Sequence, residues 1–163
     1  MLSLRSLTPA RAATLVLLGA LLPLLVALAS QYWGGLSPCE LCLDQRWALV
    51  AAGLLAIPGI FLETKPRAAR LFLYLAGAAA LVGAGIAIFH VGVEQHWWEG
   101  TSACTTKIKA GMSAADFEAA ILAAPVVRCD DIAWSLFGIS MAGYNVLYSG
   151  ALGAFSLWQA RRI

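Results

Sequence analysis

The sequence predicts an all-α membrane protein, a four-helix transmembrane bundle that forms one domain over residues 1–163. Three observations predict it: the composition, four apolar runs and an uneven distribution of basic residues. Hydrophobic residues make up 61% of the chain and charged residues only 12%, and the mean hydropathy is +0.78. Soluble domains carry about 25% charged residues. The net charge of +2 gives no indication of a nucleic-acid partner, so the lipid bilayer is the expected surrounding.

The four apolar runs approach or exceed the roughly 20 residues that a membrane-spanning helix needs. The second run is the shortest, and we expect its first turn, with Gln45 and Arg46, to lie in the boundary region of the bilayer. The third run is dense in glycine and alanine, which let membrane helices approach closely, so we expect it at the centre of the bundle. The predicted spans cover about residues 12–31, 46–62, 70–90 and 140–158.

Basic residues predict the orientation of the bundle. With four spans, both termini and the 63–70 connection share one side, and the positive-inside rule makes the more basic side cytoplasmic. Loops of about 32–45 and 91–139 are then periplasmic, and they contain all four cysteines in an oxidising compartment where disulfides persist. The chain is thus expected to be a multi-pass protein of a bacterial inner membrane. Of its eleven lysines and arginines, the cytoplasmic side holds Arg5, Arg11, Lys65, Arg67, Arg70, Arg161 and Arg162.

The first apolar run also has features of a signal peptide. Arg5 and Arg11 precede it, and the small-residue segment 27–29 ends it before Ser30, as at a cleavage site. The run is longer than a usual signal core, and its removal would leave only three helices to pack. We therefore interpret it as the first span, and cleavage would leave the later topology unchanged.

The first outer loop ends in a Cys-x-x-Cys pair, Cys39 and Cys42. Cysteines at this spacing can close a small, exchangeable disulfide when a helix begins near the second one. The helix N-terminus favours a thiolate at Cys42, and Arg46 adds a positive charge on the same helix face. We expect both effects to lower the pKa of Cys42, while Glu40 and Asp44 oppose them if they point inward. The alternatives are half of a zinc site or a passive disulfide.

The second outer loop is too long for a passive turn, and long loops are usually functional. Ser113 as a capping residue, Asp116 in the first turn and apolar residues at helical spacing predict a short amphipathic helix. This helix lies on the membrane surface or packs on the other loop. Cys104 and Cys129 flank it and enclose it if they pair. The polar stretch around Cys104 suits attack by a partner's thiolate, and a structural staple is the alternative.

His90 ends the third apolar run on the outer side. A lone histidine at a helix end is commonly a solvated or capping residue. At membrane depth, however, ionisable groups are expensive and often functional. Together with Arg46 at the same depth, His90 could flank a ligand that has polar ends and an apolar body.

In these residues the chain resembles the disulfide bond formation protein B (DsbB) family, the inner-membrane thiol:quinone oxidoreductases. The resemblance covers essentially the whole chain in order, and its first and last motifs are the specific ones. The matching segments are Pro38–Arg46, His90–Glu94, Cys104, Cys129–Asp130, Trp134–Ala142 and Tyr144–Asn145.

The resemblance implies that the four cysteines are catalytic. A reduced periplasmic thioredoxin-fold protein of the DsbA type would attack a Cys104–Cys129 disulfide at Cys104. The released Cys129 thiolate would attack Cys39 of a Cys39–Cys42 disulfide. Cys42 would then leave as a thiolate, in keeping with the rule that exchange is fastest when the leaving thiol has a low pKa.

The resemblance also implies a quinone cofactor, ubiquinone or menaquinone, drawn from the membrane pool. Arg46 would hold its carbonyl end, His90 would line the same site, and no metal is implied. A cation placed beforehand stabilises oxygens that gain negative charge, and an isoprenoid tail needs lipid.

Three other readings use the same cysteines differently. Vitamin K epoxide reductase-like enzymes perform similar chemistry, but their loop cysteines precede the Cys-x-x-Cys pair, whereas Cys104 and Cys129 follow it here. A small membrane transporter or assembly scaffold with two structural disulfides predicts inert cysteines. A zinc protein would need Cys104 and Cys129 to converge with the first pair. A relative of the DsbB family dedicated to one substrate is a variant of the preferred reading.

Overall fold

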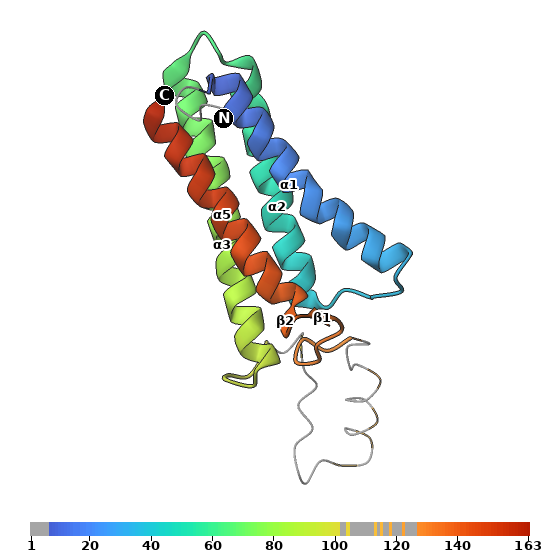
Figure 1. Cartoon of the computed structure of the whole chain (residues 1–163). Coiled ribbons are helices and arrows are strands. Elements are labelled where there is room, and N and C mark those ends of the chain that lie inside the picture. Colours follow the sequence, from blue (N-terminus) through green and yellow to red (C-terminus); the bar gives the residue numbers. More distant parts are fainter. Residues whose placement is uncertain are drawn as a thin grey trace.

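A computed structural model of the chain describes residues 7–101, 104, 113, 115, 118, 122 and 127–163. Figure 1 shows that α1 begins and α5 ends at the end of the bundle where α2 leads into α3, so the Cys-x-x-Cys pair lies at the opposite end. The described elements are α1 (Pro9–Tyr32), α2 (Glu40–Phe61), α3 (Pro66–Glu94), a hairpin of β1 (Ser135–Leu136) and β2 (Ile139–Ser140), and α5 (Met141–Arg162).

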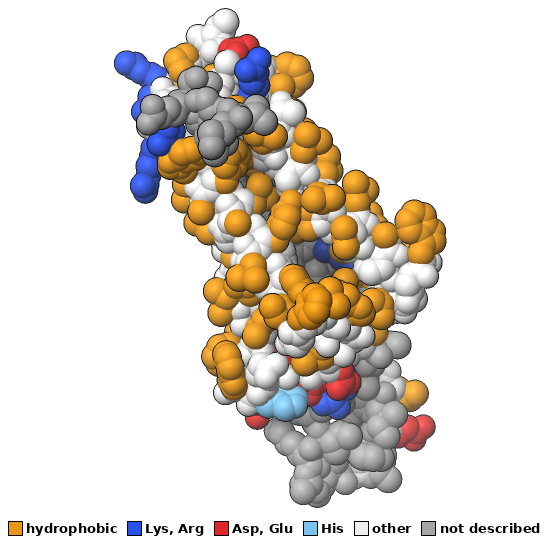
Figure 2. Space-filling view, in the orientation of Figure 1, with side chains coloured by type: hydrophobic (Ala, Val, Ile, Leu, Met, Phe, Trp, Pro, Cys, Tyr) orange, Lys and Arg blue, Asp and Glu red, His pale blue; other side chains and the backbone are white. Residues whose placement is uncertain are grey.

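Apolar surface dominates the long helices. Among the described residues, α1, α2 and α3 are the helices that are long and apolar enough to cross a membrane. Helix α5 has the length of α2 but carries more polar side chains. Figure 2 shows hydrophobic side chains along the middle of the molecule and basic ones gathered at the end where α5 finishes. The chain is therefore a membrane protein, because leucines exposed along these helices need lipid around them.

Helix α3 lies between α2 and α5, while α1 packs mainly on α2. The small residues of the third apolar run predicted this central place. Gly77 and Gly153 allow α3 and α5 to approach: a Cβ on Gly77 would lie 3.2 Å from the Gly153 carbonyl oxygen, and the reverse distance is 3.0 Å. Ser156 Oγ donates to the Leu73 carbonyl at 2.7 Å, which satisfies its hydroxyl inside the bundle.

Helix α1 is attached to α5 by one hydrogen bond near its middle. Pro23 lies inside α1 and has no N–H, so the Gly19 carbonyl lacks its usual helical partner. The hydroxyl of Tyr148 on α5 donates to that carbonyl at 2.8 Å. Beyond this contact α1 diverges from α5 toward Tyr32 (Figure 1). The divergence leaves room between the helices at the end that carries Cys39 and Cys42.

Helix α2 begins at Glu40, close to Cys42, where the sequence led us to expect a helix N-terminus. Cys39 caps it, and its first turn is polar. The structure differs from the sequence-based expectations in one local feature. The β1–β2 hairpin was not predicted. Its two central residues, Phe137 and Gly138, have φ of 51° and 77°, as a tight type I′ connection requires.

The predicted amphipathic helix of the second outer loop falls mostly outside the described residues. Its apolar positions at Phe117, Ala120, Ile121 and Ala124 are among those not described. The described positions Ala115, Glu118 and Leu122 are helical. The amphipathic character of that segment therefore stays a prediction.

Candidate functional site

The Cys39–Cys42 pair forms the N-terminal end of α2. Cys39 is the N-cap residue, and its Sγ accepts from the backbone N–H of Cys42 at 3.4 Å. The two sulfur atoms lie 3.0 Å apart as free thiols. The hydrogen bond that Cys39 donates to Cys42 Sγ, together with burial, raises the pKa of Cys39. The same bond favours the thiolate at Cys42, which also faces the free N–H groups of the helix end.

His90 reaches this pair from the last turns of α3. It is 3% exposed, and its Nε2 lies 3.6 Å from Cys39 Sγ. Its Nδ1 lies 2.9 Å from Nε2 of Gln45 on α2, and the main chain of Cys129 also interacts with the ring. The histidine is therefore neither solvated nor a helix cap, the two common roles of a lone histidine at a helix end.

Cys104 and Cys129 are joined by a disulfide, and both are fully buried. They belong to one buried cluster with Cys39, Leu41 and Val93. The cluster brings the two cysteine pairs together although they come from different outer loops. Beside it, the Arg128 guanidinium binds the Asp130 carboxylate and holds the pKa of Asp130 below its ordinary range.

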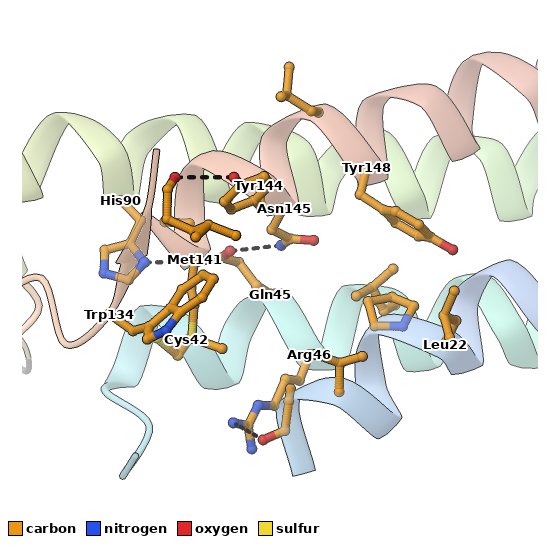
Figure 3. A pocket seen from close by; sticks show the side chains of 17 residues that line it. Leu22, Cys42, Gln45, Arg46, His90, Trp134, Met141, Tyr144, Asn145 and Tyr148 are labelled. Carbon is orange, nitrogen blue, oxygen red and sulfur yellow. Dashed lines mark hydrogen bonds between the residues drawn. The ribbon is translucent and has the colours of Figure 1, made fainter. Parts of the chain in front are cut away.

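A cavity of about 620 Å³ lies between α1, α2 and α5 and reaches Cys42. Figure 3 shows Cys42, Gln45 and Asn145 around it, with Arg46 on the α1 side. Most of its lining is apolar, with polar groups at a few places, which is typical of sites for small organic ligands. Its lining includes Leu22, Pro23, Val26, Leu49, His90, Trp134, Met141, Tyr144, Leu147 and Tyr148.

Arg46 lines the cavity, but its guanidinium is bound to α1. Nη1 donates to Gln31 Oε1 at 2.5 Å, and Nη2 donates to the Ala27 carbonyl at 3.3 Å. Arg46 lies one helical turn after Cys42 on the same face. The structure thus places the predicted cation beside the cavity and the Cys-x-x-Cys pair, with part of its hydrogen-bonding capacity used by α1.

Glu94 is a buried carboxylate at the end of α3 that the sequence analysis did not single out. Its Oε1 lies 3.9 Å from His90 Nε2, and its Oε2 accepts a hydrogen bond from Ser140 Oγ. Ser140 is also the N-cap of α5, where its Oγ accepts from Gly143 N at 3.1 Å. One hydroxyl therefore fixes the start of α5 and satisfies a buried acid.

Replacing Ser140 with alanine is expected to lower the free energy of unfolding by about 1–3 kcal/mol, because α5 loses its cap and Glu94 loses a buried partner. Reversible unfolding by sodium dodecyl sulfate in mixed micelles measures this change. Ser140→Thr keeps the hydroxyl and should stay near wild type. Equal stability of Ser140→Ala and wild type would contradict the assigned role.

Cys39, Cys42 and His90 also bring three possible metal-ligand atoms within 4.8 Å of one another. A metal requires the ring nitrogen that faces it to be unprotonated. Gln45 Nε2 approaches His90 Nδ1 as a donor, which leaves the ring hydrogen on Nε2, the atom that faces the sulfurs. This geometry suits a hydrogen bond to sulfur better than a metal bond.

The sequence analysis missed Gln45, Asn145 and Tyr148 as members of the site. Gln45 was noted for its depth and as part of a family motif, and Asn145 for the family motif alone. The available signal was an amide side chain inside an otherwise apolar helix, since polar groups at membrane depth are costly unless they have partners. Their partners come from other helices, so no local spacing in the sequence identifies them.

Comparison with known proteins places the chain in a family. The sequence model described as "Disulfide bond formation protein DsbB" matches residues 9–159. "Disulfide bond formation protein B" of Stutzerimonas stutzeri is 23% identical over 161 residues, covering 98% of this chain and 99% of the relative. "Disulfide bond formation protein B 2" of Pseudomonas syringae is 32% identical over 146 residues, covering 82% and 77%. No solved structure matches. The chain belongs to the disulfide bond formation protein B family.

Proposed function

We propose that the protein is a thiol:quinone oxidoreductase that supports disulfide bond formation. It reoxidises a periplasmic thioredoxin-fold dithiol protein of the DsbA type and passes the electrons to a membrane quinone, ubiquinone or menaquinone. The observation that carries the proposal is the largely apolar cavity between α1, α2 and α5, which reaches Cys42. A passive disulfide or a structural staple gives no reason for such a cavity beside a cysteine.

The residues around the cavity fit a quinone. Its apolar walls suit a ring and an isoprenoid tail, while Arg46 and Asn145 supply N–H donors at one end. A bound quinone would accept two electrons and two protons there. Arg46 would hold the oxygen that gains negative charge, since a preorganised cation stabilises developing charge in a site from which water is excluded. His90 would contribute through its contact with Cys39.

The electron route inside the chain consists of four thiol–disulfide exchanges. The partner's thiolate attacks Cys104 Sγ, a partner–Cys104 disulfide forms, and Cys129 leaves as a thiolate. Cys129 then attacks Cys39 of the oxidised pair, a Cys39–Cys129 disulfide forms, and Cys42 leaves as a thiolate.

The partner's second thiol next attacks the partner sulfur bound to Cys104, so the partner leaves as a disulfide and Cys104 is released as a thiolate. Cys104 attacks Cys129, which restores the Cys104–Cys129 disulfide and releases Cys39, so that Cys39 and Cys42 are both reduced. A bound quinone would then take two electrons from this pair, and the Cys39–Cys42 disulfide would re-form. The common burial of Cys39, Cys104 and Cys129 in one cluster supports this order, because exchange requires sulfur atoms to approach closely.

The proposed membrane arrangement has four spans, with α5 as the fourth and both termini in the cytoplasm. Arg161 and Arg162 at the end of α5 and the basic residues of the α2–α3 connection support this orientation. The polar side chains of α5 are compatible with a span, because Asn145 and Ser156 have hydrogen-bond partners on α2 and α3. The cysteine pairs would then face the periplasm of a bacterial inner membrane.

Quinone reduction by the purified protein in detergent micelles tests the function. A reduced DsbA-type protein serves as the electron donor, with ubiquinone and menaquinone analogues as acceptors. Donor-dependent reduction of one of these quinones is expected. Absence of turnover with every donor and both quinones would overturn the proposal and favour a transporter or scaffold with structural disulfides.

Arg46→Ala is expected to raise the quinone concentration for half-maximal rate about tenfold or more, because a charged hydrogen bond contributes roughly 1.5–3 kcal/mol. Arg46→Lys keeps the charge and should fall between this variant and wild type. Gln31→Ala is the matched control, since it removes the α1 partner of Arg46 and leaves the cation. An unchanged quinone dependence in Arg46→Ala would contradict the assignment.

A further inference from the structure

Three polar side chains join α5 to α2 inside the bundle. Ser149 Oγ donates to Asn145 Oδ1 at 2.7 Å, and Asn145 Nδ2 donates to Gln45 Oε1 at 2.7 Å. Ser149 and Gln45 are buried. Polar side chains at membrane depth are costly unless each finds a partner, so a complete set of hydrogen bonds across two helices indicates a specific arrangement.

The orientation of the Gln45 amide is fixed by its surroundings. Its Nε2 donates to the Leu41 carbonyl at 3.0 Å, and a carbonyl oxygen only accepts. Its Oε1 accepts from Asn145. If the amide were rotated by 180°, two oxygens would face each other at Leu41 and two amide nitrogens at Asn145. Gln45 therefore presents an N–H group, and not an oxygen, to His90.

This orientation selects one tautomer of His90. Because Gln45 Nε2 donates to Nδ1 at 2.9 Å, Nδ1 is the acceptor, and a neutral imidazole then carries its hydrogen on Nε2. Nε2 lies 3.6 Å from Cys39 Sγ. The hydrogen on Nε2 therefore faces Cys39 Sγ, with the Cys129 main chain and Glu94 Oε1 (3.9 Å) as further acceptors on the same side. Cys39 in turn donates to Cys42 Sγ across 3.0 Å.

We propose that Ser149, Asn145 and Gln45 are positioning residues that hold His90 as its Nε2–H tautomer, so that one hydrogen-bond chain runs from α5 to Cys42 Sγ. Every member donates to the next in the same direction, and Figure 3 marks the hydrogen bonds from Asn145 through Gln45 to His90. The proposal deepens the proposed function and rests on Cys39 and Cys42 as the redox pair. None of these three side chains has a hydrogen bond to either sulfur, so each acts through His90.

The direction of the chain has a chemical consequence. Hydrogen bonds in series polarise one another, so each donor strengthens the next. The chain ends on Cys42, the sulfur that lines the large cavity, and there it favours the thiolate over the thiol. The reduced pair is therefore held with its negative charge on the sulfur that faces the cavity and its hydrogen on the buried Cys39.

Nitrogen-15 NMR of the reduced full-length protein in micelles tests the tautomer directly. The chain has two histidines, so His96→Gln leaves His90 as the single labelled ring. The expected spectrum has a protonated Nε2 and an unprotonated Nδ1. In Gln45→Met, which keeps the side-chain length and removes the amide, the two nitrogens should move toward an average of both tautomers. A wild-type ring protonated on Nδ1, or an unaltered spectrum in Gln45→Met, would overturn the proposal.

A second measurement follows the thiolate of Cys42. In a Cys104→Ser/Cys129→Ser background, alkylation of Cys42 at neutral pH should slow about two- to threefold in Gln45→Met, since the loss reaches Cys42 only through His90 and Cys39 and each bond in a chain strengthens the next by a fraction. Asn145→Leu should slow it less, in the same direction. A loosened bundle would expose Cys42 and speed alkylation, so faster or equal rates in Gln45→Met would refute the chain.

The matched control is Gln159→Met. Gln159 is a buried amide of α5, and its Nε2 has no hydrogen-bond partner among the described residues. The same chemical change there should leave the His90 spectrum and the Cys42 alkylation rate at wild-type values. Equal effects of the two substitutions would show a general response to losing an amide and would overturn the assignment. Neither readout uses a donor protein or a quinone. Failure of the hydrogen-bond chain can therefore be distinguished from failure of the proposed thiol:quinone oxidoreductase function.

Discussion

Cys42→Ser is expected to lower donor-dependent quinone reduction at least a thousandfold, because serine can neither form a disulfide nor leave as a stabilised anion. Cys42 is the one cysteine that lines the large cavity among the residues that the structure describes. The steady-state rate with a reduced DsbA-type donor measures the effect. Cys104→Ser should fail equally, but at an earlier step, since it removes the sulfur that the donor attacks.

Single-turnover experiments separate the two variants. Cys42→Ser should still form a covalent disulfide with the donor at Cys104, whereas Cys104→Ser should form none under the same conditions. Ser37→Ala changes the loop that precedes Cys39 and leaves all four sulfurs in place. This variant should keep the wild-type rate. Turnover by Cys42→Ser within tenfold of wild type would mean that the electrons take another path.

Gly153→Val is expected to destabilise the bundle by about 3 kcal/mol, the upper part of the range for overpacking. A Cβ at this position would lie 2.7 Å from Leu81 Cγ and 3.0 Å from the Gly77 carbonyl oxygen. The backbone of α3 cannot move aside as a flexible side chain can. Unfolding by sodium dodecyl sulfate in mixed micelles measures the loss.

Gly150→Val provides the control for this substitution on the same helix. Nothing lies within 4 Å of a Cβ built on Gly150, so both variants change helix propensity alike and differ only in packing. The difference between them therefore isolates the contact between α3 and α5. Equal stabilities of the two variants would show that this close approach contributes nothing to the folded state.

The helices could be predicted because their signal is local. Continuous apolar runs identified α1, α2 and α3, and small residues such as Gly77 placed α3 at the centre. The start of α2 could not be predicted from hydropathy, because Cys39 caps it with sulfur and Glu40 begins it. The turn at Phe137 gave no signal either, since a bulky residue with positive φ is uncommon.

Within the site, too, contacts between residues close in sequence could be predicted, and contacts between helices could not. Cys39 and Cys42 are close in sequence, so their proximity followed from spacing. The approach of His90 to Cys39 depends on how α3 packs against α2 and was not predicted. The sequence left open only whether His90 is solvated or capping, or flanks a ligand together with Arg46. The contact between Gln45 and Asn145 joins residues 100 positions apart, and nothing near either residue specifies its partner. The direction in which an amide faces is a property of the assembled bundle.

The divergence of α1 beyond Pro23 determines how a hydrophobic molecule would reach Cys42. The cavity is bounded by the C-terminal half of α1 and by α5. In the proposed membrane arrangement both helices face lipid at this depth, so a tailed ligand would enter sideways from the bilayer. The ligand would then reach the cavity by two-dimensional diffusion in the bilayer. The fraction of occupied sites would depend on the mole fraction of the ligand in the lipid. In vesicles, the half-saturating amount of quinone should therefore scale with the lipid added and stay constant when the aqueous volume is changed.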